Sequence, residues 1–216
     1  MDQKLSTRDR IIDCAGDIFG QKGFRETTIR AIAKAAGVNV AAVNYYFRDK
    51  EGLYAEVLED IFSKGFQRFP SLVPETEQPP SPEERLHVFI KGTVYRLLSP
   101  EGWGGQRGKG RLIAREMLEF TPAFSQVIQR YIRPHKDELV IILREIVGDR
   151  VNQEDILFSI VSILGQCIYY VYATSLIEQI APEYAPLEAH IDRIVAHVFR
   201  FSLGGLNDIK KDKEEA

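Results

Sequence analysis

The clearest pattern of apolar and polar positions lies between residues 27 and 50. Four apolar residues follow the i, i+3, i+4, i+7 spacing of the buried side of a short helix: Ile29, Ile32, Ala33 and Ala36. Thr27 and Thr28 precede this helix as candidate N-caps. Gly37 follows it, where helices commonly end in a left-handed residue that glycine adopts without steric cost. The spacing predicts a short helix followed by a tight turn.

A second short helix is predicted directly after the turn, over residues 39–47. Asn39 can cap it, and its inner side holds Val43 and Phe47. A merely solvated outer side would be rich in Lys and Glu. This one instead carries small, amide and phenol side chains: Ala41, Ala42, Asn44 and Tyr45, with Tyr46 at its edge. Asparagine can pair bidentately with adenine, an alanine methyl can meet the thymine methyl, and tyrosine hydroxyls can reach phosphates. This side is therefore predicted to contact DNA.

Lys50 occupies an unusual place in the next predicted helix. Asp49 is the candidate N-cap, so Lys50 falls in the first turn, where the helix macrodipole disfavours a cation. A bound phosphate would resolve the conflict, because the helix N–H groups and the ammonium would both face it. A simply solvated lysine is the alternative.

Two further helices complete the N-terminal part. Ser6, with Asp9 three residues later, resembles a capping box and opens a helix that is expected to end at Gly23. After the helix-turn-helix, a fourth helix begins at Lys50 and runs to about Phe66. The first three helices predict a compact headpiece, and the fourth would join it to the rest of the chain.

The charge of the chain is unevenly distributed. The 216 residues carry a net charge of −3. Residues 1–50 hold nine Lys and Arg against six Asp and Glu, which gives this part +3 and the remainder −6. The polar start, MDQKLSTRDR, shows no signal peptide, and the two cysteines lack metal-binding spacing. A basic DNA-binding end and a cytoplasmic location are expected.

The run from Arg8 to Leu53 resembles the DNA-binding domain of TetR-family transcriptional regulators. The matching features are Gly23-Phe24, Thr27-Thr28, Ile32-Ala33, Ala36-Gly37-Val38, Tyr46-Phe47 and Lys50-Glu51. The resemblance implies a homodimer, more often a repressor, that binds a palindromic operator and is released by a small molecule. The pattern and the resemblance together give these candidate DNA contacts: Thr28, Arg30, Asn39, Ala41, Ala42, Asn44, Tyr45, Tyr46 and Lys50.

Helices are predicted throughout the remaining body. Ser81-Pro82-Glu83-Glu84 is a capping box with proline at the first helical position. The glycine-rich loop PEGWGGQRGKG fails the phosphate-loop pattern, because Gly110 rather than Ser or Thr follows Lys109, and it is expected to be a mobile connection. The segment LIAREMLEFTPAFSQVIQRYIRPHKDEL, in which Pro134 is expected to break or kink a helix, looks similar to the body of the YbiH (CecR)-type branch of the TetR family.

The longest apolar stretch lies in a helix expected to run from Asn152 to just before Pro182. Its uncharged part, ILFSIVSILGQCIYYVYATSLI, has the length of a membrane span. Serine, threonine and glutamine dilute it, however, and neither Lys nor Arg flanks it closely. A helix covered by its own body on one side and by a partner subunit on the other would show the same composition. A last helix, residues 186–203, can pack in the same way before Gly204-Gly205 ends it.

Catalytic and metal-binding patterns are absent from the sequence. His190 and His197 lie about 10.5 Å apart along a helix, too far to share a metal ion, and His87 and His135 are isolated. No Ser or Cys nucleophile pattern occurs, so an enzyme and a cofactor are not expected. An all-α enzyme and a membrane-anchored protein are the alternatives. Turnover of a bound compound would reveal the first, and fractionation without detergent the second.

The sequence therefore predicts an all-α protein: a three-helix headpiece with a helix-turn-helix, and a C-terminal helical ligand-binding and dimerisation domain. The expected boundaries are 1–50 for the DNA-binding domain, 51–66 for a connecting helix, 67–205 for the regulatory domain and 206–216 for a charged, disordered tail. The expected partners are double-stranded DNA, a second copy of the chain and a small-molecule effector. Candidate effector contacts are Trp103, Arg115, Tyr131, Tyr169 and Tyr170.

Overall fold

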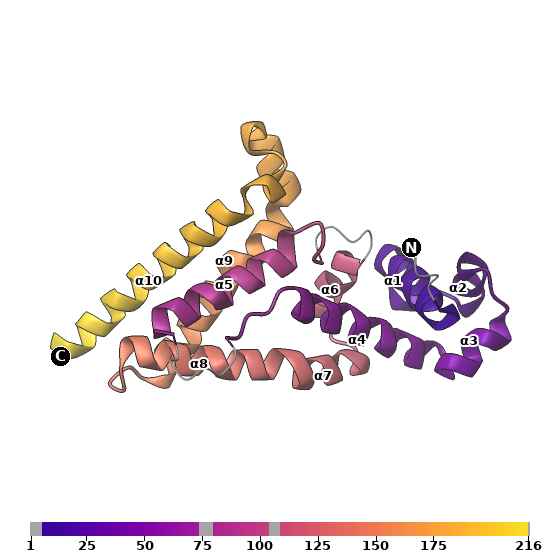
Figure 1. The fold of residues 1–216 in the computed structure, drawn as a ribbon, viewed down its shortest axis with the longest axis horizontal. Coiled ribbons are helices and arrows are strands. Elements are labelled where there is room, and N and C mark those ends of the chain that lie inside the picture. Colours follow the sequence, from indigo (N-terminus) through magenta and orange to yellow (C-terminus); the bar gives the residue numbers. More distant parts are fainter. Residues whose placement is uncertain (1–5, 74–79, 104–108, 216) are drawn as a thin grey trace. The chain divides into compact units, whose positions relative to one another are not determined.

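The computed structural model describes residues 6–73, 80–103 and 109–215, and every regular element within these ranges is a helix. The all-α prediction is therefore confirmed. The chain forms two compact units (Figure 1). The N-terminal unit comprises residues 1–64 and 105–131, and the C-terminal unit comprises residues 65–104 and 132–216. Helix α4, Lys50–Arg68, crosses from the first unit into the second.

Among the described residues, six helices belong wholly or mostly to the N-terminal unit: α1 (Thr7–Glu26), α2 (Ile29–Ala36), α3 (Val40–Phe47), α4, α6 (Lys109–Leu118) and α7 (Pro122–Val127). Ser6 caps α1 by accepting from the backbone N–H of Asp9 at 3.1 Å, as its sequence pattern predicts. Gly23, at φ 81°, kinks α1 where the sequence predicts an end, and a last turn continues to Glu26. The core of this unit holds fully buried apolar side chains, among them Ile11, Ala15, Phe19, Ile32, Val43, Leu53 and Leu58.

In the described part of the C-terminal unit, four long helices form its body: α5 (Pro82–Leu98), α8 (Arg133–Val147), α9 (Gln153–Ile180) and α10 (Ile191–Glu215). The short 3₁₀ turns η2 (Pro182–Tyr184) and η3 (Leu187–His190) join the last two. Helices α5 and α10 pack side by side (Figure 1), and both contact α8 and α9. The predicted capping box at Ser81 is present in full, with the Glu84 carboxylate accepting from the Ser81 backbone. The predicted break near Pro134 is a π-helical stretch, η1 (Ile128–Ile132), just before α8.

The end of the chain differs from the prediction. Helix α10 does not stop at Gly204-Gly205 but continues to Glu215, so the expected disordered tail is wrong. Leu206 explains the difference, because its side chain is 2% exposed and belongs to the core of the C-terminal unit. Burying a leucine stabilises by about 1.5–3 kcal/mol, which offsets the cost of about 1 kcal/mol for each helical glycine.

Two predicted connections fall partly outside the described residues. The proline-containing stretch 67–82 includes residues 74–79, and the glycine-rich loop includes residues 104–108; both ranges lie outside the described part of the chain. Of the loop, Trp103 is described, and its backbone N–H donates to the Arg96 carbonyl at 2.6 Å. Lys109, the lysine of the failed phosphate-loop pattern, is the first residue of α6 and only 8% exposed.

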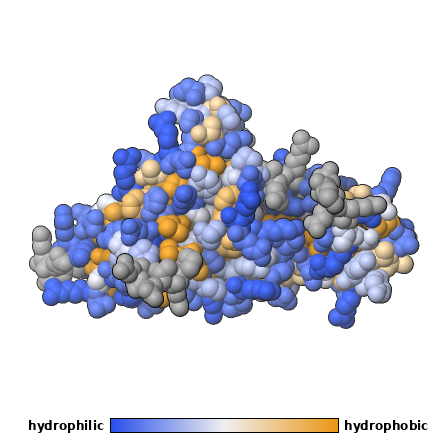
Figure 2. Space-filling model, viewed as in Figure 1, coloured by the Kyte–Doolittle hydropathy of each residue, from blue (hydrophilic) through white to orange (hydrophobic). Residues whose placement is uncertain are grey.

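Helix α9 exposes much of its apolar surface. It is long and apolar enough to cross a membrane by length and composition, a test that the core helix of a soluble protein also passes. One side packs on the C-terminal core through Ile156, Ile160, Ile163 and Cys167. The opposite side shows six large side chains that are 48–73% exposed: Phe158, Val161, Tyr169, Tyr172, Leu176 and Ile180. Figure 2 shows apolar residues at the surface of the region where α5, α9 and α10 lie.

Candidate functional site

The turn between α2 and α3 is built by local hydrogen bonds. Thr28 caps α2 by accepting from the Ala31 N–H at 3.2 Å. Gly37 adopts φ 65°, ψ 38°, the left-handed conformation that its position predicts. The Val38 N–H then donates to the Ala33 carbonyl at 2.9 Å and closes the C-terminal end of α2. These bonds fix the direction in which the chain enters α3.

Helix α3 has one buried and one exposed side. Asn39 caps it by accepting from the Ala42 N–H at 2.7 Å. Val43 and Phe47 are 0% and 4% exposed, so they hold the helix against the N-terminal core. Tyr45, by contrast, is 83% exposed. A large aromatic side chain standing in solvent beside small neighbours is a surface suited to contact with another molecule.

Most of the other predicted DNA contacts are exposed. Ala42 is half-buried beside the exposed side, and the remaining five are exposed: Thr28, Arg30, Ala41, Asn44 and Tyr46. Asn39 is exposed as well, although its amide oxygen already serves as the α3 cap. The structure therefore presents the predicted α3 side chains together on one side of a short helix. An α-helix with such a side fits the width of a DNA major groove.

Lys50 is bonded within the fold. Its Nζ donates to the carbonyls of Phe24 at 3.1 Å and Thr27 at 3.2 Å, and it lies 4.4 Å from the centroid of the Phe24 ring. Carbonyls at the C-terminal end of α1 form the negative end of that helix, so they offset the unfavourable place of Lys50 at the start of α4. An ammonium has three N–H donors, and these bonds use two of them. The third donor is compatible with a phosphate contact.

The link between α3 and α4 contains a feature that the sequence pattern does not reveal. Arg48 adopts φ 68°, an uncommon conformation for a residue other than glycine. Its backbone N–H donates to the Asn44 carbonyl and ends α3. Asp49 then caps α4, as predicted, by accepting from the Gly52 N–H at 2.7 Å. The sharp turn at Arg48 sets α4 directly after the exposed helix.

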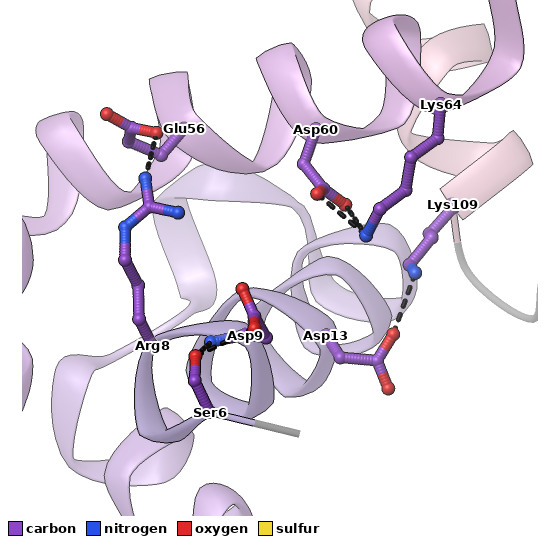
Figure 3. A network of polar contacts seen from close by, with 8 residues as sticks. All are labelled: Ser6, Arg8, Asp9, Asp13, Glu56, Asp60, Lys64 and Lys109. Carbon is purple, nitrogen blue, oxygen red and sulfur yellow. Dashed lines mark hydrogen bonds and ion pairs between the residues drawn. The ribbon is translucent and has the colours of Figure 1, made fainter. Parts of the chain in front are cut away.

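Ion pairs tie α1 to α4 and α6 within the N-terminal unit (Figure 3). Arg8 of α1 contacts Glu56 of α4 at 2.6 Å, and Lys109 of α6 contacts Asp13 of α1 at 2.8 Å. The Arg8 pair is about half exposed on both sides, and pairs of this kind contribute little. In the second pair the Lys109 side chain is 11% exposed and that of Asp13 is 59% exposed. Together the two ion pairs connect α1 to α4 and to α6.

A buried polar contact joins α4 to α6. Glu116 is 1% exposed, and its carboxylate accepts from the Tyr54 hydroxyl and from the backbone N–H and hydroxyl of Thr121. Burial, reinforced by the bond to Glu116, raises the pKa of Tyr54 well above its usual value. Both residues line a cleft of about 660 Å³ in the N-terminal unit. The contact fixes the first turns of α4 on α6.

The five candidate effector residues are divided between the two units. Arg115 lines the cleft of the N-terminal unit and is exposed, and Tyr131 donates to Glu59 at 2.6 Å in the same unit. Tyr169 is 62% exposed on the outer side of α9. Trp103 and Tyr170 belong to the C-terminal unit, where both pack against its core.

Two residues that sequence reasoning missed lie near Trp103 and Tyr170. Arg96 is 4% exposed, and its guanidinium carbon lies 5.9 Å from the Trp103 ring. Cys167 is 1% exposed and lies close enough to both Arg96 and Tyr170 to influence their ionisation. The available signal was Arg96 itself, which interrupts the apolar side of α5 between Thr93 and Leu97. In the described ranges, no group of three His, Cys, Asp or Glu side chains could hold a metal ion.

Comparison with known proteins places these features in a family. A family model of bacterial regulatory proteins of the tetR family matches residues 11–57, and a model of the C-terminal domain of the HTH-type transcriptional dual regulator CecR matches residues 82–206. The HTH-type transcriptional regulator YttP of Bacillus subtilis strain 168 is 31% identical over 142 residues, which are 66% of this chain and 65% of YttP. The dual regulator CecR of Shigella flexneri is 25% identical over 167 residues, which are 76% of this chain and 74% of CecR.

Solved structures of TetR-like regulators share the fold. A TetR-like transcriptional regulator from Rhodococcus sp. RHA1 superposes with a TM-score of 0.63 over 96% of this chain and 99% of that one, at 19% identity. A helix-turn-helix headpiece on a helical C-terminal unit defines a DNA-binding transcriptional regulator. The chain belongs to the TetR family of such regulators and carries a CecR-type C-terminal domain. Members of this family are transcriptional regulators rather than enzymes.

Proposed function

We propose that this protein is a homodimeric repressor that acts in the cytoplasm, binds a palindromic operator and is released by a small-molecule effector. The exposed side of α3 supports the operator contact more than any other observation. Tyr45 is 83% exposed beside Asn44 and Ala41, while Val43 and Phe47 hold the helix from within. One such helix from each subunit would enter successive major grooves, so the operator would share the two-fold symmetry of the dimer.

The exposed side of α9 supports the homodimer. Its six large exposed side chains lie three, four or, between Val161 and Tyr169, eight residues apart, and all fall opposite the buried side of the helix. Phe201 of α10, 67% exposed, adds to the same kind of surface. A partner subunit accounts for this surface better than a membrane does. Ser162 and Gln166 are also on α9, where Gln166 donates to Ser202 of α10, and both would be costly in lipid.

Effector release requires a difference in affinity between two states. The effector must bind the DNA-incompetent dimer more tightly, because equal affinity for both states would shift nothing. A coupling of about 1–3 kcal/mol would suffice. Helix α4 is the proposed carrier, since it runs from the end of the DNA-binding headpiece into the C-terminal unit and is fixed at its first turns by Tyr54 and Glu116.

Operator binding is tested by gel-shift titration on DNA taken from upstream of the gene and its neighbours. Asn44→Ala should relax the preference at one base position in each half-site, at a cost of about 1–3 kcal/mol there. Arg30→Gln should weaken binding to every sequence and reduce the salt slope by about one. Tyr45→Ala should weaken binding to all DNA sequences equally. Tyr184→Ala, at an exposed tyrosine of the C-terminal unit, is the matched control.

Unchanged operator affinity in Asn44→Ala, Arg30→Gln and Tyr45→Ala would exclude this recognition surface. A protein found in the membrane fraction without detergent would instead favour a membrane role for α9. Turnover of a bound compound would favour an enzyme. Each result separates one alternative from the regulator.

A further inference from the structure

Arg96 of α5 is a buried cation in the C-terminal unit. The residue is 4% exposed, and its guanidinium carbon lies 4.1 Å from the centroid of the Phe66 ring and 5.9 Å from that of Trp103. Aromatic faces attract a guanidinium, but they carry no net charge. Arginine is almost never fully buried without an anionic partner. A buried arginine at this position is therefore expected to have an anionic partner.

The described residues supply neutral acceptors only. Arg96 donates through Nη1 to the Phe69 carbonyl at 2.5 Å and through Nη2 to the Thr93 hydroxyl at 3.1 Å. A guanidinium has five N–H donors. Within the part of the chain that the structure describes, no carboxylate pairs with Arg96. Among the described residues, the charge is thus hydrogen-bonded in part and not neutralised.

Arg85, on the same helix, shows the contrast. It precedes Arg96 by eleven residues, three helical turns, so both project from the same side of α5. Arg85 pairs with Glu138 at 2.7 Å and with Glu145 at 2.6 Å, both from α8. The fold therefore provides two acids for one arginine of α5, and the described residues provide none for the other.

A second buried polar group beside α5 also lacks a partner. Ser71 is 1% exposed, and its hydroxyl makes no hydrogen bond to the described residues. The backbone of Pro70 and Ser71 lies against Gly92, where an added Cβ would stand 2.3 Å from the Pro70 carbonyl oxygen and 2.9 Å from the Ser71 Cα. Gly92 is one turn before Arg96. The backbone of Ser71, whose hydroxyl is unsatisfied among the described residues, therefore lies beside α5 one turn from Arg96.

Cys167 does not supply the missing negative charge. Burial raises the pKa of its thiol to about 12, so the group is neutral at physiological pH. Burial lowers the pKa of Arg96 to about 9, so the guanidinium still carries its charge at physiological pH. The remaining neighbours, Phe66 and Trp103, are aromatic. The surroundings fit an anion with one charge on an apolar body.

We propose that Arg96 binds the carboxylate of an organic acid with an aromatic or aliphatic body, and that Ser71 donates a further hydrogen bond to it. This inference rests on the proposed function, since the acid would be the effector that releases the operator. The guanidinium fork matches the two oxygens of a carboxylate. A phosphate monoester, with nearly two negative charges, would leave an excess of charge beside a single cation.

The first test needs no ligand. Arg96→Met in the full chain should unfold at the same temperature as wild type or higher, because it removes an unneutralised buried charge and keeps the apolar packing. Arg85→Met is the matched control and should unfold at a lower temperature, because it leaves Glu138 and Glu145 without their partner. If both variants lost stability to the same extent, Arg96 would be fully compensated within the fold and the inference would be wrong.

The second test measures binding to the full-length protein, free and on its operator, through Trp103, the only tryptophan of the chain. The probes are phenylacetate, 4-phenylbutyrate and decanoate, each with its uncharged amide, and inorganic phosphate. In wild type and Arg85→Met, at least one acid should bind about tenfold more tightly than its amide. Arg96→Met should lose this preference, Arg96→Lys should keep part of it, and Ser71→Ala should weaken the acid a few-fold.

Three results would reject the proposal: equal affinity for acids and amides, acid binding that survives Arg96→Met, or binding of phosphate alone. Binding of none of the acids would reject this class of effector. Operator binding by the acid-free wild type is measured in the same experiment. It reports the proposed DNA-binding function separately, so failure of one can be told from failure of the other.

Discussion

Replacing Phe158 by aspartate tests the proposed subunit contact of α9. Phe158 is 62% exposed in the single chain, and a phenylalanine presents about 200 Å², so a partner would cover about 120 Å² of it. At about 25 cal/mol per Å², this area is worth about 3 kcal/mol. A two-fold interface contains the residue twice, so the dimer would lose about 6 kcal/mol. The desolvation of two carboxylates adds to this cost.

The expected result is a dissociation constant raised by about 10⁴-fold, since about 1.4 kcal/mol is a factor of ten. Sedimentation velocity at micromolar concentration should show monomers for Phe158→Asp and dimers for wild type. The variant should also lose operator binding in a gel shift, while its circular dichroism keeps its helix content. Ile141→Asp is the matched control, because Ile141 is 48% exposed on α8, outside the α9 surface, and should leave the dimer intact.

A monomeric wild type that still binds the operator would refute the dimer. A dimeric Phe158→Asp would show that the subunits meet elsewhere, and the exposed side of α9 would then need a different partner. Loss of the dimer in Ile141→Asp as well would mean that aspartate acts on folding rather than on the interface.

Substitutions at three positions test the N-terminal unit. Tyr54→Phe should cost about 1–3 kcal/mol in urea denaturation, because Glu116 loses a donor. Because the pKa of Tyr54 is raised in the fold, its contribution to stability is complete below pH 10 and falls progressively above pH 10. Above pH 10, wild type should therefore lose stability more steeply than Tyr54→Phe. Parallel plots of stability against pH would contradict this. Lys50→Met should lower both the urea midpoint and the operator affinity, because the carbonyls of Phe24 and Thr27 lose their donor. An unchanged urea midpoint would mean that Lys50 does not stabilise the fold and that phosphate binding is its only role. Gly37→Ala should cost about 1–2 kcal/mol through its φ of 65°, and Gly37→Asn less; equal stability would exclude strain there.

The helix-turn-helix could be predicted closely because local contacts decide it. The caps at Thr28 and Asn39 bond residues three positions away, and Gly37 acts through its own backbone. Such contacts are encoded in adjacent sequence, so spacing alone identifies them. The exposure of Tyr45 follows from the same helical period that buries Val43 and Phe47.

Longer contacts decided what the sequence did not predict. The two glycines of α10 favour a helix end, but Leu206 is buried against the core and carries the helix past them. The partners of Lys50 lie 26 and 23 residues away, and Tyr54 meets Glu116 across 62 residues. Sequence spacing contains no record of such pairs. Tyr169, an effector contact predicted from the sequence, is exposed on α9, whereas Arg96, which the sequence pattern does not predict, is buried.

Three features of the sequence contradict the usual placement of charged and apolar residues. The described chain resolves one of these conflicts and leaves two open. Lys50 stands at the unfavourable end of a helix, and carbonyls of α1 resolve the conflict within the chain. Helix α9 is apolar all round, and the described chain covers only one of its sides. Arg96 places a charge among apolar residues, and the described residues leave it without an anion. Natural sequences keep such conflicts where function requires them. The two that the described chain leaves open are the two for which a partner from outside is proposed, a second subunit for α9 and an organic acid for Arg96.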